Sequence, residues 1–165
     1  MPPAFGPDRV WLVLLEAMTD NSSRSLRTLI FDPAPATTGV GLLLLRVWLG
    51  ATMLVYHGWT KLANFDALST RFPDALHLGS PTASLALSTF AEFGCAALLV
   101  VGVATRPAAF VLIVNMAVAF VAGHGMSLTG ATSGELAFVY LAGFIALLFT
   151  GAGPYSGDAA ISTTR

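Results

Sequence analysis

The chain has 165 residues, of which 55% are hydrophobic and only 10% are charged, and its mean hydropathy is +0.75. Soluble domains carry about 25% charged residues, so this composition is typical of a protein that resides in a lipid bilayer. The formal net charge of −1 without a basic run excludes nucleic acid as a partner, and the single cysteine, Cys95, excludes an internal disulfide and a covalently attached haem.

Residues 1–36 are predicted to be an N-terminal extension that is interfacial or poorly ordered. They mix charged residues with one nine-residue apolar run, VWLVLLEAM, which itself contains a glutamate. About 20 apolar residues are needed to cross a bilayer, so this run is too short to span it. The start of the native protein stays open between Met1 and Met18.

Four apolar segments of span length follow, and Gly, Pro, Ser and Thr mark the breaks between them. Their predicted bounds are 39–59, 82–102, 107–126 and 133–152. Gly and Ala are frequent in these segments and allow close helix packing in lipid. We therefore predict an all-α fold, a transmembrane antiparallel four-helix bundle over residues 37–160, with residues 161–165 as a C-terminal tail.

The loop VGVATRPAA between the second and third segments predicts a tight hairpin. Gly102 is suited to end the second helix, Thr105 to cap the third, and Pro107 to occupy the first turn of the third. We expect these two helices to be antiparallel neighbours.

Lys and Arg residues outside the deep parts of the spans indicate how the chain is oriented. Five fall on one side of the predicted membrane: Arg9, Arg24, Arg27, Arg106 and Arg165. Two fall on the other side: Lys61 and Arg71. Because positive residues concentrate in cytoplasmic loops, we predict a multi-pass protein of the plasma membrane with both termini in the cytoplasm.

Two ionisable residues lie deep in the predicted spans, Arg46 in the first and Glu92 in the second. A charge inside a bilayer costs about 2.5–3.5 kcal/mol on insertion scales, so such residues usually face the interior and pair. At about 1.5 Å per residue the two lie roughly 5 Å apart in depth, which a guanidinium can bridge. We expect a buried ion pair of Arg46 and Glu92 that fixes helix packing. The alternative is a buried proton or substrate site.

A second polar group is expected near the outer end of the bundle. In YHGWTKL, His57 and Lys61 share one helix face with Arg46, since each residue adds about 100° around the axis. His124 and Glu135 reach a similar depth in the third and fourth spans. We predict that His57, Lys61, His124 and Glu135 form a polar pocket.

Phe65 and Phe72, in the outer loop, are the predicted apolar walls of that pocket. The alternative is that its four polar residues are separate interface residues. A haem held by the two imidazoles would leave the lysine and the glutamate without a role. No metal is expected, because the histidines and the glutamate lack any local ligand spacing.

Several motifs of the chain resemble those of a known family. They are LLLRVWLGATMLVYHGWTKL, FAEFGCAALLVVGVATRPAA and GAGPYSGDAAI, together with Phe65, Gly79 and Pro81 between the first two. Over roughly residues 39–160 the chain resembles the DoxX family of small bacterial membrane proteins. Gly157 departs from the family pattern, in which a larger apolar residue is more usual between Ser and Asp.

The resemblance implies a four-helix bundle in the bacterial inner membrane, and some family members are associated with quinone-linked sulfur oxidation or with oxidoreductase complexes of redox stress. We therefore expect a quinone-interacting membrane subunit of such a complex, with quinone as its ligand. The chain has no GxGxxG motif after a strand, so any other redox cofactor belongs to a partner.

The expected partners are the lipid bilayer, a soluble redox protein and a second copy of the chain. The alternative function is a non-catalytic assembly factor or small-solute carrier whose Arg–Glu pair is structural. Since family similarity does not fix chemistry, it stays open whether the chain is an enzyme subunit.

Overall fold

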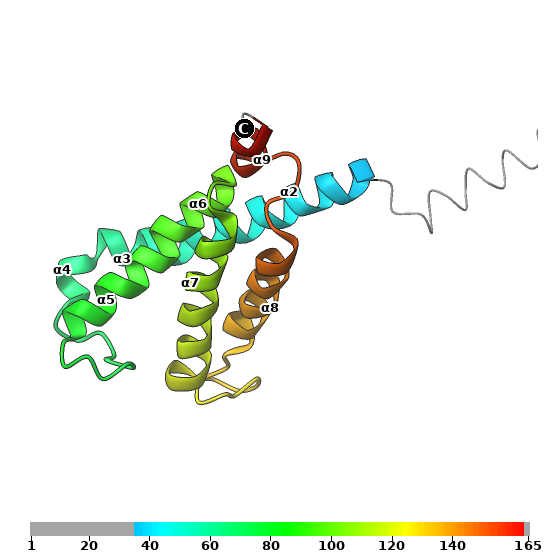
Figure 1. Ribbon diagram of the computed structural model, residues 1–165. Coiled ribbons are helices and arrows are strands. Elements are labelled where there is room, and N and C mark those ends of the chain that lie inside the picture. Colours follow the sequence, from blue (N-terminus) through cyan, green and yellow to red (C-terminus); the bar gives the residue numbers. More distant parts are fainter. Residues whose placement is uncertain (1–34, 164–165) are drawn as a thin grey trace, which may run out of the picture. The chain divides into compact units, whose positions relative to one another are not determined.

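The computed structural model describes residues 35–163, and every regular element in this range is a helix (Figure 1). The chain divides into two units, Met1–Thr38 and Gly39–Arg165, and the site described below lies within the second. Nearly all of the predicted N-terminal extension, the alternative start at Met18, and the last two residues of the predicted tail lie outside the described residues. The all-α prediction is confirmed for the described range.

Within the described range, three helical segments are long and apolar enough to cross a membrane. They are Thr37–Ala63 with 27 residues, Pro81–Val101 with 21 and Thr105–Gly123 with 19. Each matches one of the first three predicted spans to within a few residues. The fourth predicted span corresponds to α8 (Glu135–Thr150), which is apolar but has only 16 residues.

Each long segment contains a π-helical turn between or after α-helical parts. The first comprises α2 (Pro35–Thr52), η1 (Met53–Gly58) and α3 (Trp59–Ala63); the second α5 (Pro81–Thr89), η2 (Phe90–Cys95) and α6 (Ala96–Val101); the third α7 (Thr105–Val118) and η3 (Ala119–Gly123). Two short helices complete the fold, α4 (Phe65–Leu68) and α9 (Gly157–Thr163). A π turn adds one residue to a helical turn, so it rotates the following side chains relative to a regular α-helix.

The helices of the second unit pack through small residues and a narrow apolar core. α7 and α8 lie side by side (Figure 1), and η1 packs against η2. The largest fully buried apolar side chains are Met53, Leu85, Leu99, Leu112, Phe144 and Leu147. Gly50 meets the backbone of α6, and Gly143 in α8 meets Leu49 in α2. In lipid, such close contacts stabilise helix pairs through packing rather than through exclusion of water.

The hairpin between α6 and α7 is confirmed, with one correction to its cap. Gly102 ends α6 in the left-handed conformation with φ +76°, as predicted. Thr105 is not the N-cap but the first residue of α7, which follows Ala104. The cap is supplied by Asp158, whose carboxylate oxygens accept hydrogen bonds from the N–H groups of Ala104 and Thr105 at 2.7 and 3.0 Å. A side chain distant in sequence thus takes the role that the local motif assigned to Thr105.

Candidate functional site

An ion pair between a half-buried lysine and a buried glutamate joins the first and second long helical segments. Lys61 Nζ in α3 lies 2.5 Å from Glu92 Oε1 in η2 and donates a hydrogen bond to it. The same ammonium donates to Ser88 Oγ in α5 at 2.9 Å. The Glu92 side chain is 4% exposed and that of Lys61 is 21% exposed. The carboxylate is therefore enclosed, whereas the ammonium stays near the surface.

Gly58 brings the two segments close enough for this pair to form. A Cβ atom at Gly58 would collide with the backbone carbonyl of Glu92, so glycine permits an approach that a larger residue would prevent. Lys61 lies one turn after Gly58, and Ser88 lies one turn before Glu92. Residues three or four apart share a helix face, so the glycine contact places Lys61 opposite both of its partners.

The third long segment adds an amide to the pair. Asn115 in α7 donates from Nδ2 to Glu92 Oε1 at 2.9 Å, and Ser88 Oγ lies 3.4 Å from the same oxygen. Glu92 Oε2 is buried and has no hydrogen-bond partner among residues 35–163. Both oxygens of a carboxylate can accept hydrogen bonds, so one acceptor of this group is not used by the described protein groups.

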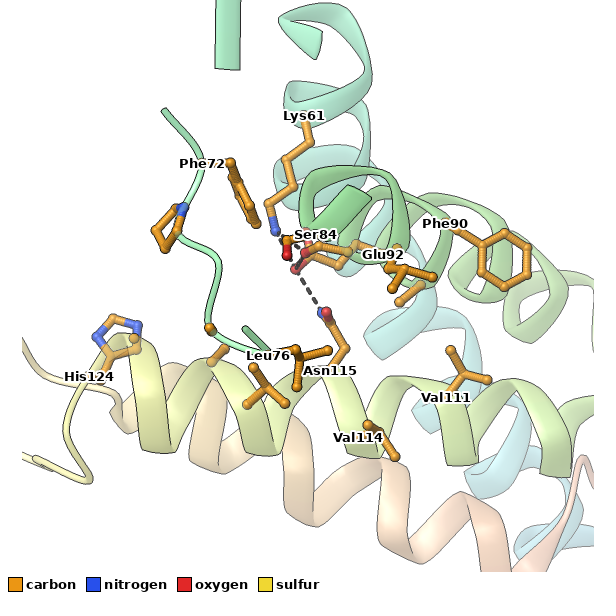
Figure 2. A pocket seen from close by; sticks show the side chains of 18 of the residues that line it. Lys61, Phe72, Leu76, Ser84, Phe90, Glu92, Val111, Val114, Asn115 and His124 are labelled. Atoms are coloured by element: carbon orange, nitrogen blue, oxygen red, sulfur yellow. Dashed lines mark hydrogen bonds and ion pairs between the residues drawn. The ribbon is translucent and has the colours of Figure 1, made fainter. Parts of the chain in front are cut away.

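A cavity of about 510 Å³ lies beside this cluster, between α5–η2 and α7–η3 (Figure 2). Lys61, Ser88, Glu92 and Asn115 are on its wall. Most of its other lining residues are apolar, among them Leu87, Phe90, Phe110, Val111, Val114 and Val118. The cavity is thus an apolar space with one cluster of hydrogen-bonding groups.

The outer loop contributes to the cavity wall. Phe72 and Leu76 line it, and Figure 2 shows both across from α7. Lys61 Nζ lies 5.6 Å from the centre of the Phe72 ring, a distance at which a cation is attracted to an aromatic face. Phe65, the other predicted wall residue, lies in α4 and is not part of the lining.

Asp74 holds the outer loop in this position. Its carboxylate accepts a hydrogen bond from Ser84 Oγ at 2.6 Å and from the N–H groups of Leu78 and Gly79 at 2.9 and 2.7 Å. These hydrogen bonds hold the pKa of Asp74 below its ordinary value, and the bond from Ser84 has the largest effect. The loop is therefore fastened to α5, the helix that carries Ser88.

Arg46 does not pair with Glu92, contrary to the sequence prediction. Its side chain is buried, and its guanidinium donates to the carbonyl oxygens of Leu99, Val100 and Tyr155 at 2.8, 2.9 and 2.9 Å. Glu92 is paired with the lysine instead. The prediction compared depth alone, and Arg46 in fact faces the end of α6 and the segment before α9.

The structure brings together two of the four residues predicted to form the outer pocket. Lys61 and His124 both line the cavity, although Figure 2 shows His124 apart from the ion pair. The His57 ring packs edge-on against Tyr140, with centroids 5.9 Å apart, and is not part of the cavity lining. Glu135 is exposed in the first turn of α8 and is likewise not part of the lining.

Sequence reasoning missed Ser88 and Asn115. Asn115 carried a usable signal, because an amide in an apolar span usually bonds to a neighbouring helix. Ser88 lies four residues before Glu92 and so shares its helix face, but serine is common in such spans and gave no distinct signal.

The polar groups of the cavity are suited to hydrogen-bonding an organic ligand. Lys61, Ser88 and Asn115 carry N–H or O–H groups, and Glu92 carries a free acceptor oxygen. Residues 35–163 contain no group of three His, Cys, Asp or Glu side chains placed to hold a metal ion. Carbonyl groups of a ligand match the donors that are present, whereas Glu92 Oε2 is enclosed by protein atoms.

The described range has three apolar helices long enough to cross a membrane. Helices approach one another closely at glycines, and an ion pair joins two of the long segments. These features define an all-helical integral membrane protein. The chain belongs to the DoxX family, whose family model matches residues 41–125, just over half of the chain. The family prediction is therefore confirmed, and Lys61, Glu92 and Asn115 lie within the matched residues.

The chain is also similar to an uncharacterized protein of Haemophilus influenzae. The two are 37% identical over 113 residues, which cover 66% of this chain and 81% of that relative. No solved structure matches the chain.

Proposed function

We propose that the protein is the membrane subunit of a quinone-linked oxidoreductase and that the cavity holds the quinone head group. The observation that carries this proposal is one cluster of hydrogen-bonding groups, in which Glu92 is buried and Lys61, Ser88 and Asn115 are half-buried, in an otherwise apolar cavity of about 510 Å³. Sites for small molecules and cofactors are typically of about 300–1,000 Å³, mostly apolar, with a few placed polar groups.

The donors of the cluster support this choice of ligand. Lys61, Ser88 and Asn115 can reorient N–H or O–H groups toward a ring carbonyl, and Phe72 offers an apolar wall for the ring. A bound quinone supplies the capacity to take up electrons and protons. Donors in a low-dielectric site stabilise negative charge that develops on an oxygen, which is the role assigned to these residues.

Exposed side chains on the cavity wall support entry from the lipid. Phe90 and Phe110 are 58% and 57% exposed, and both line the cavity. In membrane-spanning helices, exposed apolar faces contact lipid tails. A lipid-soluble ligand therefore reaches the cavity sideways, between η2 and α7, without passing through water.

Electrons enter from a soluble redox protein in this proposal. The sequence carries no dinucleotide-binding motif, so the chain supplies the quinone site and the partner supplies the electron donor. Gentle extraction and affinity purification should recover quinone together with a soluble redox protein. Native mass spectrometry of the same material tells whether a second copy of the chain is present.

We propose α8 as the fourth span of an antiparallel four-helix bundle over residues 37–160. Its 16 residues reach about 24 Å at 1.5 Å per residue, somewhat less than a hydrocarbon core of about 30 Å. Local thinning of the bilayer accommodates such a mismatch at modest cost. Four spans place both termini in the cytoplasm of a bacterial inner membrane, in line with the excess of arginine on that side.

Thiol labelling of intact cells tests this topology. In a Cys95→Ala background, Thr70→Cys and Ala131→Cys should react with an impermeant reagent from outside, because both positions are exposed in the two outer loops. Ser162→Cys, exposed in α9, should react only after permeabilisation. Labelling of Ser162→Cys from outside would overturn the four-span arrangement.

Photoaffinity labelling tests the quinone site. An azidoquinone with a decyl chain, applied to the protein in lipid nanodiscs, should label peptides of η2 and α7, and Lys61→Met should reduce that labelling several-fold. Arg71→Met is the matched control, because Arg71 is an exposed cation of the outer loop outside the cavity lining. Labelling spread over all helices, or unchanged in Lys61→Met, would refute the site.

A non-catalytic assembly factor or small-solute carrier is the competing function. One observation favours it, because the ion pair of Lys61 and Glu92 neutralises itself and can hold two helices together without a ligand. This alternative predicts that Lys61→Met lowers stability, that no quinone copurifies with the protein, and that redox-linked function persists as far as the variant accumulates.

A further inference from the structure

Among the described residues that line the cavity, His124 is the one titratable side chain outside the ion pair of Lys61 and Glu92. A quinone that takes up two electrons to become a quinol also takes up two protons, so its site needs a group that exchanges protons. Glu92 is buried, and Lys61 donates to Glu92 and Ser88, so both charges are held within the cluster. Histidine side chains exchange protons readily near neutral pH. His124 is therefore the residue of the cavity wall that is suited to this task.

The proton of the neutral His124 ring can be placed from one hydrogen bond. Nδ1 lies 3.1 Å from the carbonyl oxygen of Thr132. A carbonyl oxygen only accepts hydrogen bonds, so Nδ1 carries the proton in this contact. Nε2 then has the lone pair of the ring, and it makes no hydrogen bond within residues 35–163. The bond to Thr132 thus leaves Nε2 free to accept and release protons.

His124 lies between the cavity and the loop 124–134. It directly follows η3 and is half-buried on the cavity wall, whereas Thr132 in the loop is exposed. A Cβ atom at Gly134 would collide with the His124 side chain, so glycine allows the start of α8 to pack against the histidine. The ring is therefore held by contacts on its loop side, while the residue borders the cavity on the other.

Few ionisable side chains occur on the elements around His124. The loop residues 125–133 contain none. Glu135, the first residue of α8, is exposed. Asp74 is the ionisable residue of the stretch 72–76, whose other residues line the cavity, and its carboxylate is engaged with three hydrogen-bond donors. His124 forms no ion pair with any described residue.

Water can connect His124 to a ring that is bound at the ion-pair cluster. His124 lies nine positions after Asn115, which is about 13 Å along α7 and η3 at about 1.5 Å per residue. A head group held by Lys61 and Asn115 therefore leaves the end of the cavity beside His124 to other molecules (Figure 2). A water takes up about 30 Å³, so the cavity of about 510 Å³ has room for a head group and several waters.

We propose that His124 supplies the ring protons when a bound quinone is reduced and takes them from the water beside the loop 124–134. The inference rests on the proposed quinone-binding function and adds the route of the protons. In each transfer the Nε2–H bond of the imidazolium breaks, its proton enters the water chain, and an O–H bond forms on a ring oxygen. Nε2 then takes a proton from the outer water. Two such transfers, with two electrons from the soluble redox partner, convert the quinone into a quinol.

Nitrogen NMR of the unaltered protein tests the role of Nε2. The protein would be labelled with ¹⁵N at its three histidines and placed in lipid nanodiscs, and His57→Asn and His77→Asn identify the His124 signals by elimination. The neutral ring should show a protonated Nδ1 and a bare Nε2. Addition of decylbenzoquinone should shift the Nε2 signal and leave Nδ1 nearly unchanged. A proton on Nε2 of the neutral ring, or an Nε2 signal that does not respond to the quinone, would overturn the proposal.

His124→Asn separates proton transfer from structure. Asparagine can still donate a hydrogen bond to Thr132, but it does not take up a proton near neutral pH. The variant should bind decylbenzoquinone as tightly as the unaltered protein. An electrode that replaces the redox partner should reduce the bound quinone at least tenfold more slowly, after subtraction of the rate in empty nanodiscs, and dissolved imidazole should restore part of the rate. His57→Asn is the matched control and should change neither quantity, because His57 is outside the cavity lining.

The outcomes separate this inference from the proposed function. An unchanged reduction rate in His124→Asn, with quinone bound, would overturn the proton route and leave the quinone site in place. Loss of quinone binding in that variant would assign His124 a structural role and equally overturn the inference. Absence of quinone binding by the unaltered protein would refute the proposed function and this inference with it. If His124→Asn does not fold, the NMR measurement on the unaltered protein decides.

Discussion

Removal of Lys61 should destabilise the protein more than removal of Glu92, because the two charges differ in burial. Lys61→Met leaves a carboxylate that is 4% exposed and keeps only the donors of Asn115 and Ser88. Breaking a buried pair in this way costs about 3–5 kcal/mol. Glu92→Gln leaves an ammonium that is 21% exposed, with Ser88 still as its acceptor, so we expect a cost of about 1–3 kcal/mol.

A double-mutant cycle measures whether the two residues act as a pair. The free energy of unfolding would be followed by circular dichroism as SDS is titrated into dodecyl maltoside micelles. The double variant Lys61→Met/Glu92→Gln should cost less than the sum of its single variants, with a coupling of about 0.5–3 kcal/mol. Arg46→Met/Glu92→Gln is the control, and its effects should add to within about 0.5 kcal/mol, because the two side chains share no hydrogen-bond partner.

Additive losses in the cycle of Lys61 and Glu92 would refute the ion pair as the contact that joins the first two long segments. Coupling in the cycle of Arg46 and Glu92 would instead reinstate the pair predicted from sequence depth. A larger loss for Glu92→Gln than for Lys61→Met would contradict the argument from burial.

Three further predictions concern the contacts around the site. Gly58→Ala should cost about 1–3 kcal/mol in unfolding free energy, because its Cβ meets the carbonyl of Glu92; Gly41→Ala, whose Cβ meets nothing within 4 Å, is the control, and an equal loss there would contradict the contact. Asn115→Leu keeps the number and branching of the side-chain heavy atoms but removes the donor to Glu92, so it should cost about 1–3 kcal/mol, whereas a neutral effect would show that the amide is dispensable. Asp158→Ala should weaken the start of α7 by about 0.5–2 kcal/mol. Burial acts to raise the pKa of Asp158, but hydrogen bonds from the N–H groups of Thr105 and Ala104 outweigh it and hold the pKa below its ordinary value. Its contribution is therefore present above about pH 4 and lost as pH falls through the lowered pKa, and Asp158→Asn should abolish that part of the pH dependence of unfolding.

The lengths and positions of the helices could be predicted because they depend on local properties. A run of about 20 apolar residues needs to be helical in lipid, whatever its neighbours are. Gly102 could likewise be placed, since a helix that ends before a tight turn favours a residue tolerant of positive φ. The cap of α7 could not be predicted in this way, because Asp158 comes from a distant part of the chain.

Partners across helices could not be predicted from depth and helix face. The prediction placed Arg46 and Glu92 at similar depths, but Glu92 lies beside Gly58, whereas Arg46 lies beside Leu99 and Val100 at the end of α6. The π turns η1 and η2 add to the difficulty, because each rotates the following residues relative to the regular step that the prediction assumed. His57 shows the result, since it was grouped with Lys61 yet packs against Tyr140.

The two polar centres inside the helices differ in their surroundings, and this difference is the basis on which we propose a ligand at one of them. At Arg46, three backbone carbonyls accept hydrogen bonds from the two terminal guanidinium nitrogens, while Nε has no partner among the described residues. A Cβ on Gly102 would collide with that side chain, so the centre is closed by protein. At Glu92, one oxygen is surrounded by donors and the other has none among the described residues, while the side chain lies on a cavity wall. A structural role accounts for the three hydrogen bonds of the first centre, because they fix the packing of α2, α6 and the segment before α9. The second centre differs because it lies beside a cavity, which a structural role alone does not require.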